Sequence, residues 1–314
     1  MKKCIWVFSL FLILFLFSCE TTLNVAVNRP ADVDLGTATS IAIEPIEYTY
    51  YLNRTEQTYA REVVTYLEYN LEREFNYDNY FRIIGTKDRR TPADVYLEGE
   101  IVRFEITDEQ KVNKIKNPEY VKPVEGQKAN KYIPEYIEEI RYKRSVNLIY
   151  RYQYVDGYSN RVLYKNEIEK YGASSWVLKM SELPDPYSLI SSYLNDIVKK
   201  MAREIKPYVV NKTLSLMEVK DNSEMEYADK LAEKGYFDES YNKFIEIYRN
   251  TGMFEAYYNA AIVLQAKGEL QNAKDMMKQL YLQTFDSRAE RALKDIEDEI
   301  FYQSEYERQK SNRM

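Results

Sequence analysis

The hydrophobic positions of the chain follow two periods, which divide it into a sheet-rich part and a helical part. Alternation of apolar and polar residues predicts a strand with one buried face, whereas apolar residues three or four apart predict an amphipathic helix. Residues 40–206 show both periods, but residues 222–302 show only the helical one. We therefore expect two domains, at 24–210 and 222–302.

The first of these domains is predicted to contain several strands. Its expected strands are residues 40–45, 80–84, 94–106, 142–155 and 161–168. Residues 142–155 place valine, leucine and tyrosine side chains on one face, and only Arg144 and Ile149 break the alternation. Asp156 and Gly157 form a dipeptide that is typical of a tight hairpin turn. This segment is therefore expected to be the long central strand of a hairpin.

Two helices are expected in the same domain. One spans 55–75 with Thr55 as its N-cap and an apolar residue at every fourth position; the other spans 184–206. The order of elements favours an α+β fold, a mixed sheet with both helices on one face. Residues 107–138 are charged, carry three prolines and show neither period, so they are expected to be a long loop or charged insertion.

Composition excludes several classes of chemistry. The 314 residues contain no histidine, which removes the commonest general base and metal ligand, and we expect no catalytic residue, metal or cofactor. The only cysteines are Cys4 and Cys19, and both lie at the amino terminus. The formal charge of -6, without a basic tract, argues against a nucleic-acid partner.

The amino terminus has the pattern of an export signal. Lys2 and Lys3 precede an uncharged apolar run that ends at Ser18, which is too short to span a bilayer comfortably. Leu16-Phe17-Ser18-Cys19 resembles the lipobox of bacterial lipoproteins, although Phe17 replaces the usual small residue. The resemblance implies cleavage after residue 18, lipid on Cys19 and a tether at 19–23. An ordinary signal peptide or an uncleaved signal anchor is the alternative.

The element order behind this lipobox resembles two groups of envelope proteins. It is similar to the small periplasmic domains of the curli secretion lipoprotein and of the lipoprotein activators of penicillin-binding proteins. Arg29-Pro30-Ala31 followed by a short strand also resembles the opening of uncharacterised envelope lipoproteins. Neither resemblance rests on a motif, so neither transfers a functional residue.

The helical part repeats itself. Residues 231–240 align with residues 264–273 at a shift of 33, which brings Gly235 onto Gly268. This pattern resembles the tetratricopeptide repeat and implies that both glycines end a first helix in a left-handed turn. A pair of generic helical hairpins is the alternative. Residues 287–302 are expected to be a capping helix, and residues 303–314 a flexible tail.

Together these features predict a membrane-anchored envelope lipoprotein that acts as a non-enzymatic scaffold for another envelope protein. By the sorting rule of the lipoproteins that this chain resembles, Glu20 rather than aspartate after the cysteine implies the periplasm-facing side of the outer membrane over the inner membrane. The alternatives are a subunit of an oligomeric secretion or envelope-assembly complex and, with only surface carboxylates behind it, a cell-wall hydrolase. Residues expected to line a partner-binding groove of the repeats are Glu224, Tyr227, Leu231, Tyr257, Ala260 and Leu264.

Overall fold

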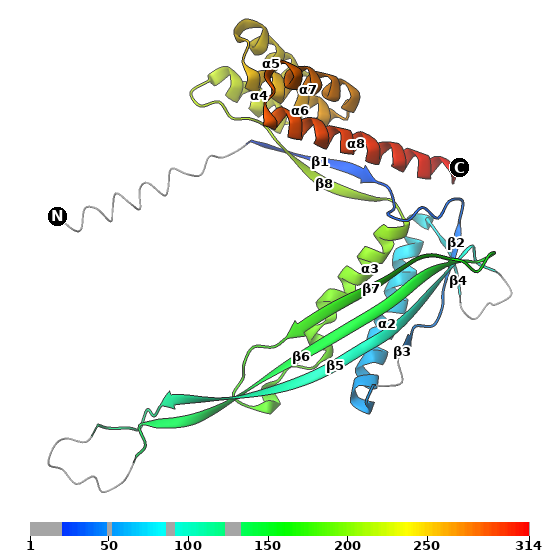
Figure 1. Ribbon diagram of the computed structural model, residues 1–314, viewed down its shortest axis with the longest axis vertical. Helices are drawn as coiled ribbons and strands as arrows, with labels where there is room; N and C mark the ends of the chain where they lie inside the picture. Colours follow the sequence, from blue (N-terminus) through cyan, green and yellow to red (C-terminus); the bar gives the residue numbers. More distant parts are fainter. Residues whose placement is uncertain (1–20, 49–51, 86–91, 123–132, 314) are drawn as a thin grey trace. The chain divides into compact units, whose positions relative to one another are not determined.

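The computed structural model describes residues 21–48, 52–85, 92–122 and 133–313. These residues form two compact units (Figure 1). The sheet unit comprises Asp32–Lys206 with Arg313, and the helical unit combines the residues up to Ala31 with Pro207–Asn312. The expected boundary at 24–210 thus requires a correction, because both ends of that range belong to the helical unit.

The sheet unit has the mixed α/β architecture that was predicted. Its strands are β2 (Ser40–Ile43), β3 (Glu47–Tyr48), β4 (Arg82–Ile84), β5 (Val95–Lys116), β6 (Tyr136–Asp156) and β7 (Val162–Ala173). They lie in the order β4-β2-β5-β6-β7, with β3 also beside β5. The pairs made by β2 are parallel, whereas β5, β6 and β7 are antiparallel neighbours. The sheet is therefore mixed.

Two α-helices cover one face of this sheet. They are α2 (Arg54–Asn76) and α3 (Ser191–Ile205), and they pack against each other and against the strands in a single hydrophobic core. The predicted stripe of α2 is buried: Leu67, Leu71 and Phe75 are fully covered. Short 3-10 helices lie at Tyr77–Asn79, Met180–Glu182 and Tyr187–Leu189.

The start of α2 differs from the prediction. Asn53, not Thr55, is the N-cap: its side chain accepts a hydrogen bond from the Glu56 backbone, and Glu56 accepts one from the Asn53 backbone. This is a complete capping box, which satisfies two backbone donors at once. The acid that completes the box lies three residues after Asn53, so it cannot be found when the box is counted from Thr55.

Three tyrosines of β6 lie at the centre of the core. Tyr150, Tyr152 and Tyr154 are almost completely buried. Gly99 on the neighbouring strand leaves room for the Tyr150 ring, because an added Cβ there would collide with it. The Tyr152 hydroxyl donates to the buried Glu204 carboxylate at 2.6–2.7 Å. This bond satisfies a polar group that would otherwise be costly to bury.

The predicted loop at 107–138 is, over much of its length, a strand ribbon. β5 continues to Lys116 and β6 begins at Tyr136, and the two strands pair throughout. Arg144, which breaks the apolar alternation, donates to Asp108 at 2.7 Å on the opposite strand. The strands could not be predicted from alternation of apolar and polar residues, because charged residues occupy both faces of this part of the ribbon. We call residues 108–116 and 136–144 the arm; it extends away from the helix-covered sheet (Figure 1).

Within the described residues, the helical unit has five α-helices and one two-stranded ribbon. The helices are α4 (Ser223–Glu233), α5 (Phe237–Thr251), α6 (Phe254–Lys267), α7 (Leu270–Thr284) and α8 (Ser287–Ser311), and each packs on the next. Residues 223–311 are thus all-α, as predicted. The ribbon pairs β1 (Thr22–Arg29) with β8 (Tyr208–Ser215) in antiparallel register.

The predicted flexible tail at 303–314 is helical as far as Ser311. The Gln309 side chain is buried. It accepts a hydrogen bond from the Ala31 N–H and donates one to the Ala31 carbonyl. Arg308 and Glu305 form an ion pair one turn apart. These contacts extend the capping helix because they give its polar end fixed partners within the unit.

Candidate functional site

The six residues expected to line a groove separate into two groups. On α4, Glu224 and Tyr227 are exposed and Leu231 is half-buried. On α6, by contrast, Tyr257, Ala260 and Leu264 are less than a tenth exposed, and the Tyr257 hydroxyl donates to Gln279 of α7 at 2.9 Å. Tyr257 and Ala260 therefore form the packing between helices, whereas Leu264 also lines a pocket.

The β1–β8 ribbon covers the adjacent faces of α4 and α6. Leu23 of β1 and Leu214 of β8 lie in the same hydrophobic cluster as Met225 of α4. The Asn259 side chain of α6 accepts a hydrogen bond from the Met217 backbone N–H at 2.7 Å and donates one to the Met217 carbonyl at 3.0 Å. The chain's own strands thus occupy a surface that a partner could otherwise use.

Charged side chains fix the ribbon to α8. Arg29 of β1 donates twice to Glu299, at 2.6 and 2.8 Å, and Lys212 of β8 reaches Glu299 at 3.1 Å and Asp295 at 2.8 Å. The Glu299 side chain is only 6% exposed. Burial alone would raise the pKa of Glu299, but the hydrogen bonds from Arg29 and Lys212 outweigh it and lower that pKa.

The two predicted turn glycines have the expected conformation. Gly235 has φ +80 and Gly268 has φ +87, both in the left-handed region that side chains disfavour. After Gly268, the Glu269 N–H bonds back to the Leu264 carbonyl at 2.9 Å, which satisfies an end carbonyl of α6. This turn places Lys267 and Glu269 on either side of the glycine, at the rim of a pocket.

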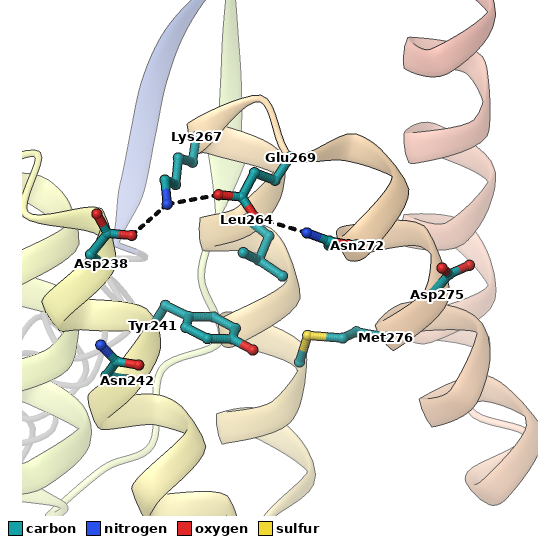
Figure 2. Close-up of a pocket in the computed structure, with 9 residues that line it drawn as sticks. All are labelled: Asp238, Tyr241, Asn242, Leu264, Lys267, Glu269, Asn272, Asp275 and Met276. Atoms are coloured by element: carbon teal, nitrogen blue, oxygen red, sulfur yellow. Dashed lines mark hydrogen bonds and ion pairs between the residues drawn. The ribbon is translucent and has the colours of Figure 1, made fainter.

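That pocket, of about 420 Å³, lies between α5 and α7 above the end of α6 (Figure 2). Leu264, Tyr241 and Met276 give it an apolar floor. Leu264 is about 140° around α6 from Asn259, so the pocket and the ribbon use different sides of this helix. Its polar rim consists of Asp238, Asn242, Lys267, Glu269, Asn272 and Asp275.

The rim carries an acidic excess. Lys267 contacts Asp238 at 2.5 Å and Glu269 at 2.7 Å, and Asn272 donates to Glu269 at 2.9 Å. The hydrogen bond to Asp238 raises the pKa of Lys267, and the hydrogen bond from Lys267 lowers the pKa of Glu269. The rim thus holds three carboxylates and one ammonium group, and the third carboxylate, Asp275, accepts a hydrogen bond from Gln271 rather than pairing with Lys267. Such a site suits an aliphatic chain that ends in a positive charge.

Two sheet carboxylates that could serve as the acidic pair of a hydrolase already have partners on the neighbouring strand. Glu98 accepts from Gln153 at 2.7 Å, and Glu100 lies 4.0 Å from Arg151. Within the described ranges, histidine, cysteine and acidic residues do not cluster in a metal-binding group of three, nor is any helix long and apolar enough to cross a membrane. Cys19 and the lipobox lie outside the described residues.

Comparison with known proteins yields only distant structural neighbours. The sequence matches no family model and no curated protein. A homologue of the neuraminyllactose-binding hemagglutinin from Helicobacter pylori is 11% identical, over 55% of this chain and 83% of its own, with a TM-score of 0.29. A hypothetical protein from Chlamydia trachomatis is also 11% identical, over 52% and 96%, with a TM-score of 0.30. The PelC dodecamer from Paraburkholderia phytofirmans is 12% identical, over 59% and 99%, with a TM-score of 0.26.

Proposed function

We propose that this chain is a lipid-anchored lipoprotein of the bacterial cell envelope that binds another envelope protein as a non-enzymatic scaffold. The observation that carries the proposal is the pocket between α5 and α7, which has an apolar floor and an acidic rim. The side of α4 and α6 that faces the ribbon is already covered by β1 and β8. The partner therefore binds on the pocket side of the helices.

The anchor of the proposed lipoprotein is lipid on Cys19, facing the periplasm at the outer membrane. Only Glu20 and Thr21 separate Cys19 from the first residue of β1. Three extended residues span roughly 10 Å, so an anchored Cys19 holds the helical unit close to the membrane surface. Two or three acyl chains suffice for stable attachment. The left-handed turns at Gly235 and Gly268 support the tetratricopeptide-like interpretation of this unit.

The proposed partner presents a lysine or arginine on an exposed segment. Its aliphatic stem would pack on Tyr241 and Met276, and its charge would meet Asp275 and Asp238 at the rim. Truncation of such an anchoring residue at an interface typically costs more than 1 kcal/mol. Reversal of the rim charge is therefore expected to weaken binding by at least about tenfold.

The test uses a photo-crosslinking amino acid at Asn242 in whole cells, with the exposed Lys294 of α8 as the matched control position. We expect a discrete cross-linked partner from position 242, which is lost when Asp275→Lys is added. Intact mass should show acylated Cys19, and Cys19→Ala should release the protein from membranes. Equal cross-linking from positions 242 and 294, unchanged by Asp275→Lys, would contradict the scaffold function.

A further inference from the structure

The outer edge of β5 in the arm has no partner strand among the described residues. β3 reaches only as far as Ile101, and every ladder partner of Glu105–Lys116 comes from β6 on the other side. An unpaired strand edge presents a row of backbone donors and acceptors that can bind a further strand. Outward from the Tyr142–Val177 bridge at its base, the described part of the arm is also a two-stranded ribbon. Such a ribbon is only marginally stable in water without additional packing.

The side chains of this edge strand change sign along its length. Glu105, Asp108 and Glu109 are acidic, whereas Lys111, Lys114 and Lys116 are basic. An antiparallel copy of the same strand, centred on Gln110, would reverse this order and bring Glu109 opposite Lys111, while Asp108 would lie opposite Val112. Opposite charges across a strand pair are stabilising, and like charges are destabilising. The strand is therefore complementary to itself.

Among the described residues of the arm, Lys111 forms no ion pair. Lys111 lies directly opposite Arg141 on β6, and Arg141 bonds to Glu139 of its own strand at 2.5 Å. The Glu109 side chain is 46% exposed, and its ion pair with Lys143 is long, at 3.9 Å. Lys111 thus lies next to a cation, Arg141, on β6, and is exposed to solvent. Glu109, two residues away on the same face of the strand, forms only a long ion pair.

We propose that a second copy of this chain binds along the edge of β5, with a two-fold axis at Gln110. Residues of a continuous sheet that oppose each other point to the same face. With Gln110 opposite its own equivalent, Glu109 of each copy lies opposite Lys111 of the other. The contact is isologous, so it closes as a dimer. It is independent of the helical pocket and gives the scaffold two copies.

The register is tested with single cysteines in the full chain carrying Cys4→Ser and Cys19→Ser, extracted in mild detergent. Gln110→Cys is expected to give a disulfide-linked dimer, because the two residues 110 face each other within disulfide reach. Lys114→Cys is the matched control: its two copies would lie eight residues apart along the strands, roughly 27 Å. Equal yields at the two positions, or more dimer from Lys114→Cys, would overturn the proposal.

Charge exchange tests the same contact without relying on a disulfide. Glu109→Lys and Lys111→Glu are each expected to weaken association about tenfold in sedimentation velocity, since two attractive pairs become repulsive. Mixing these two variants should restore the dimer as a heterodimer, and the double variant should associate like the unchanged chain. Because the mixture contains both altered chains, recovery cannot be explained by unfolding. A monomer at tens of micromolar, or a dimer insensitive to the exchange, would refute the interface.

Discussion

Two antiparallel ribbons of two strands, both within the described part of the chain, are stabilised in different ways. In the helical unit, the β1–β8 ribbon lies on the helices, buries Leu23 and Leu214, and is tied to α8 through Arg29 and Glu299. In the arm of the sheet unit, no helix covers β5 and β6, and Val112 remains 51% exposed. A hairpin of two strands gains its stability from a packed face. The first ribbon has this face within its own unit, and the second has charges and an open edge instead.

This difference indicates where each ribbon can act. The β1–β8 ribbon is a structural element, because its removal would expose the apolar residues of α4 and α6 that it covers. The arm contributes little to the core of its unit, so its sequence is free to serve association.

Leu23→Ala is expected to lower the free energy of unfolding of the helical unit by about 2–4 kcal/mol, since it leaves a cavity beneath the ribbon. Val112→Ala on the arm is the matched truncation and should cost less than about 0.5 kcal/mol. Urea unfolding measures both, followed by hydrogen exchange of α4 and α6 for Leu23→Ala and of β5 and β6 for Val112→Ala. Similar effects of the two truncations would contradict the distinction between the ribbons.

Arg29→Ala is expected to destabilise the helical unit by about 1–3 kcal/mol, because it removes two charge-assisted hydrogen bonds to a buried carboxylate that keeps only Lys212. The pKa of Glu299 is lowered in the folded state. The stability that ionised Glu299 contributes is therefore fully present above its unfolded pKa near 4.5. It is lost as the pH falls through the lower pKa of the folded state.

Unfolding of the unchanged protein and of Arg29→Ala should thus be compared at pH 7 and pH 3. We expect the difference between the two proteins to shrink at the lower pH. Arg308→Ala, which removes an exposed pair one turn from Glu305, is the control. A difference that is the same at both pH values would show that the carboxylate of Glu299 is not what Arg29 stabilises.

Asp229→Asn is expected to stabilise the helical unit at alkaline pH. Burial raises the pKa of Asp229 to about 7, with Glu233, Glu218 and Glu226 adding to the effect. The unfolded carboxyl ionises near pH 4 but the folded one only near 7, so stability falls as pH rises between these values.

The variant should therefore gain about 1–2 kcal/mol at pH 8.5 and nothing near pH 4. Thermal unfolding at the two pH values measures this gain. The exposed Asp298→Asn is the control and should change neither midpoint. Equal stabilisation by Asp229→Asn at both pH values would mean that its charge carries no penalty.

Gly268→Ala has the smallest expected effect, a loss of about 1 kcal/mol, because alanine must adopt a φ of +87 at the end of α6. Gly85→Ala is the control, since an added Cβ there meets nothing within 4 Å and the backbone is not left-handed. The rim of the pocket should move with the turn, so binding at the pocket should weaken in the first variant only.

The sequence was sufficient for elements whose stabilising partners are local. The stripes of α2 and α3 and the turns at Gly235 and Gly268 follow from spacing within a few residues, and the structure confirms them. The arm was missed because its order lies in cross-strand pairs such as Asp108 with Arg144, which no single strand reveals. β1 was assigned to the wrong unit because its partner β8 lies far away in the chain.

The candidate pocket was only partly foreseeable. Leu264 was singled out as a groove residue and does line it, but the apposition of α5 and α7 supplies Tyr241 and Met276. The visible signal was the turn glycine at 268 with a lysine before it and a glutamate after it. Which helices then enclose that turn depends on tertiary packing, which the repeat alone does not specify.

The central claim is that the segment just after Cys19 is a strand of the helical unit, and a disulfide across the ribbon tests it most directly. Asn24 lies opposite Thr213, and the Thr213 hydroxyl donates to the Asn24 side chain at 2.8 Å. With Cys4→Ser and Cys19→Ser in place, Asn24→Cys with Thr213→Cys should form an internal disulfide under mild oxidation. Asn24→Cys with Val209→Cys, four residues out of register, should not. Equal oxidation of both pairs, or of neither, would contradict the account.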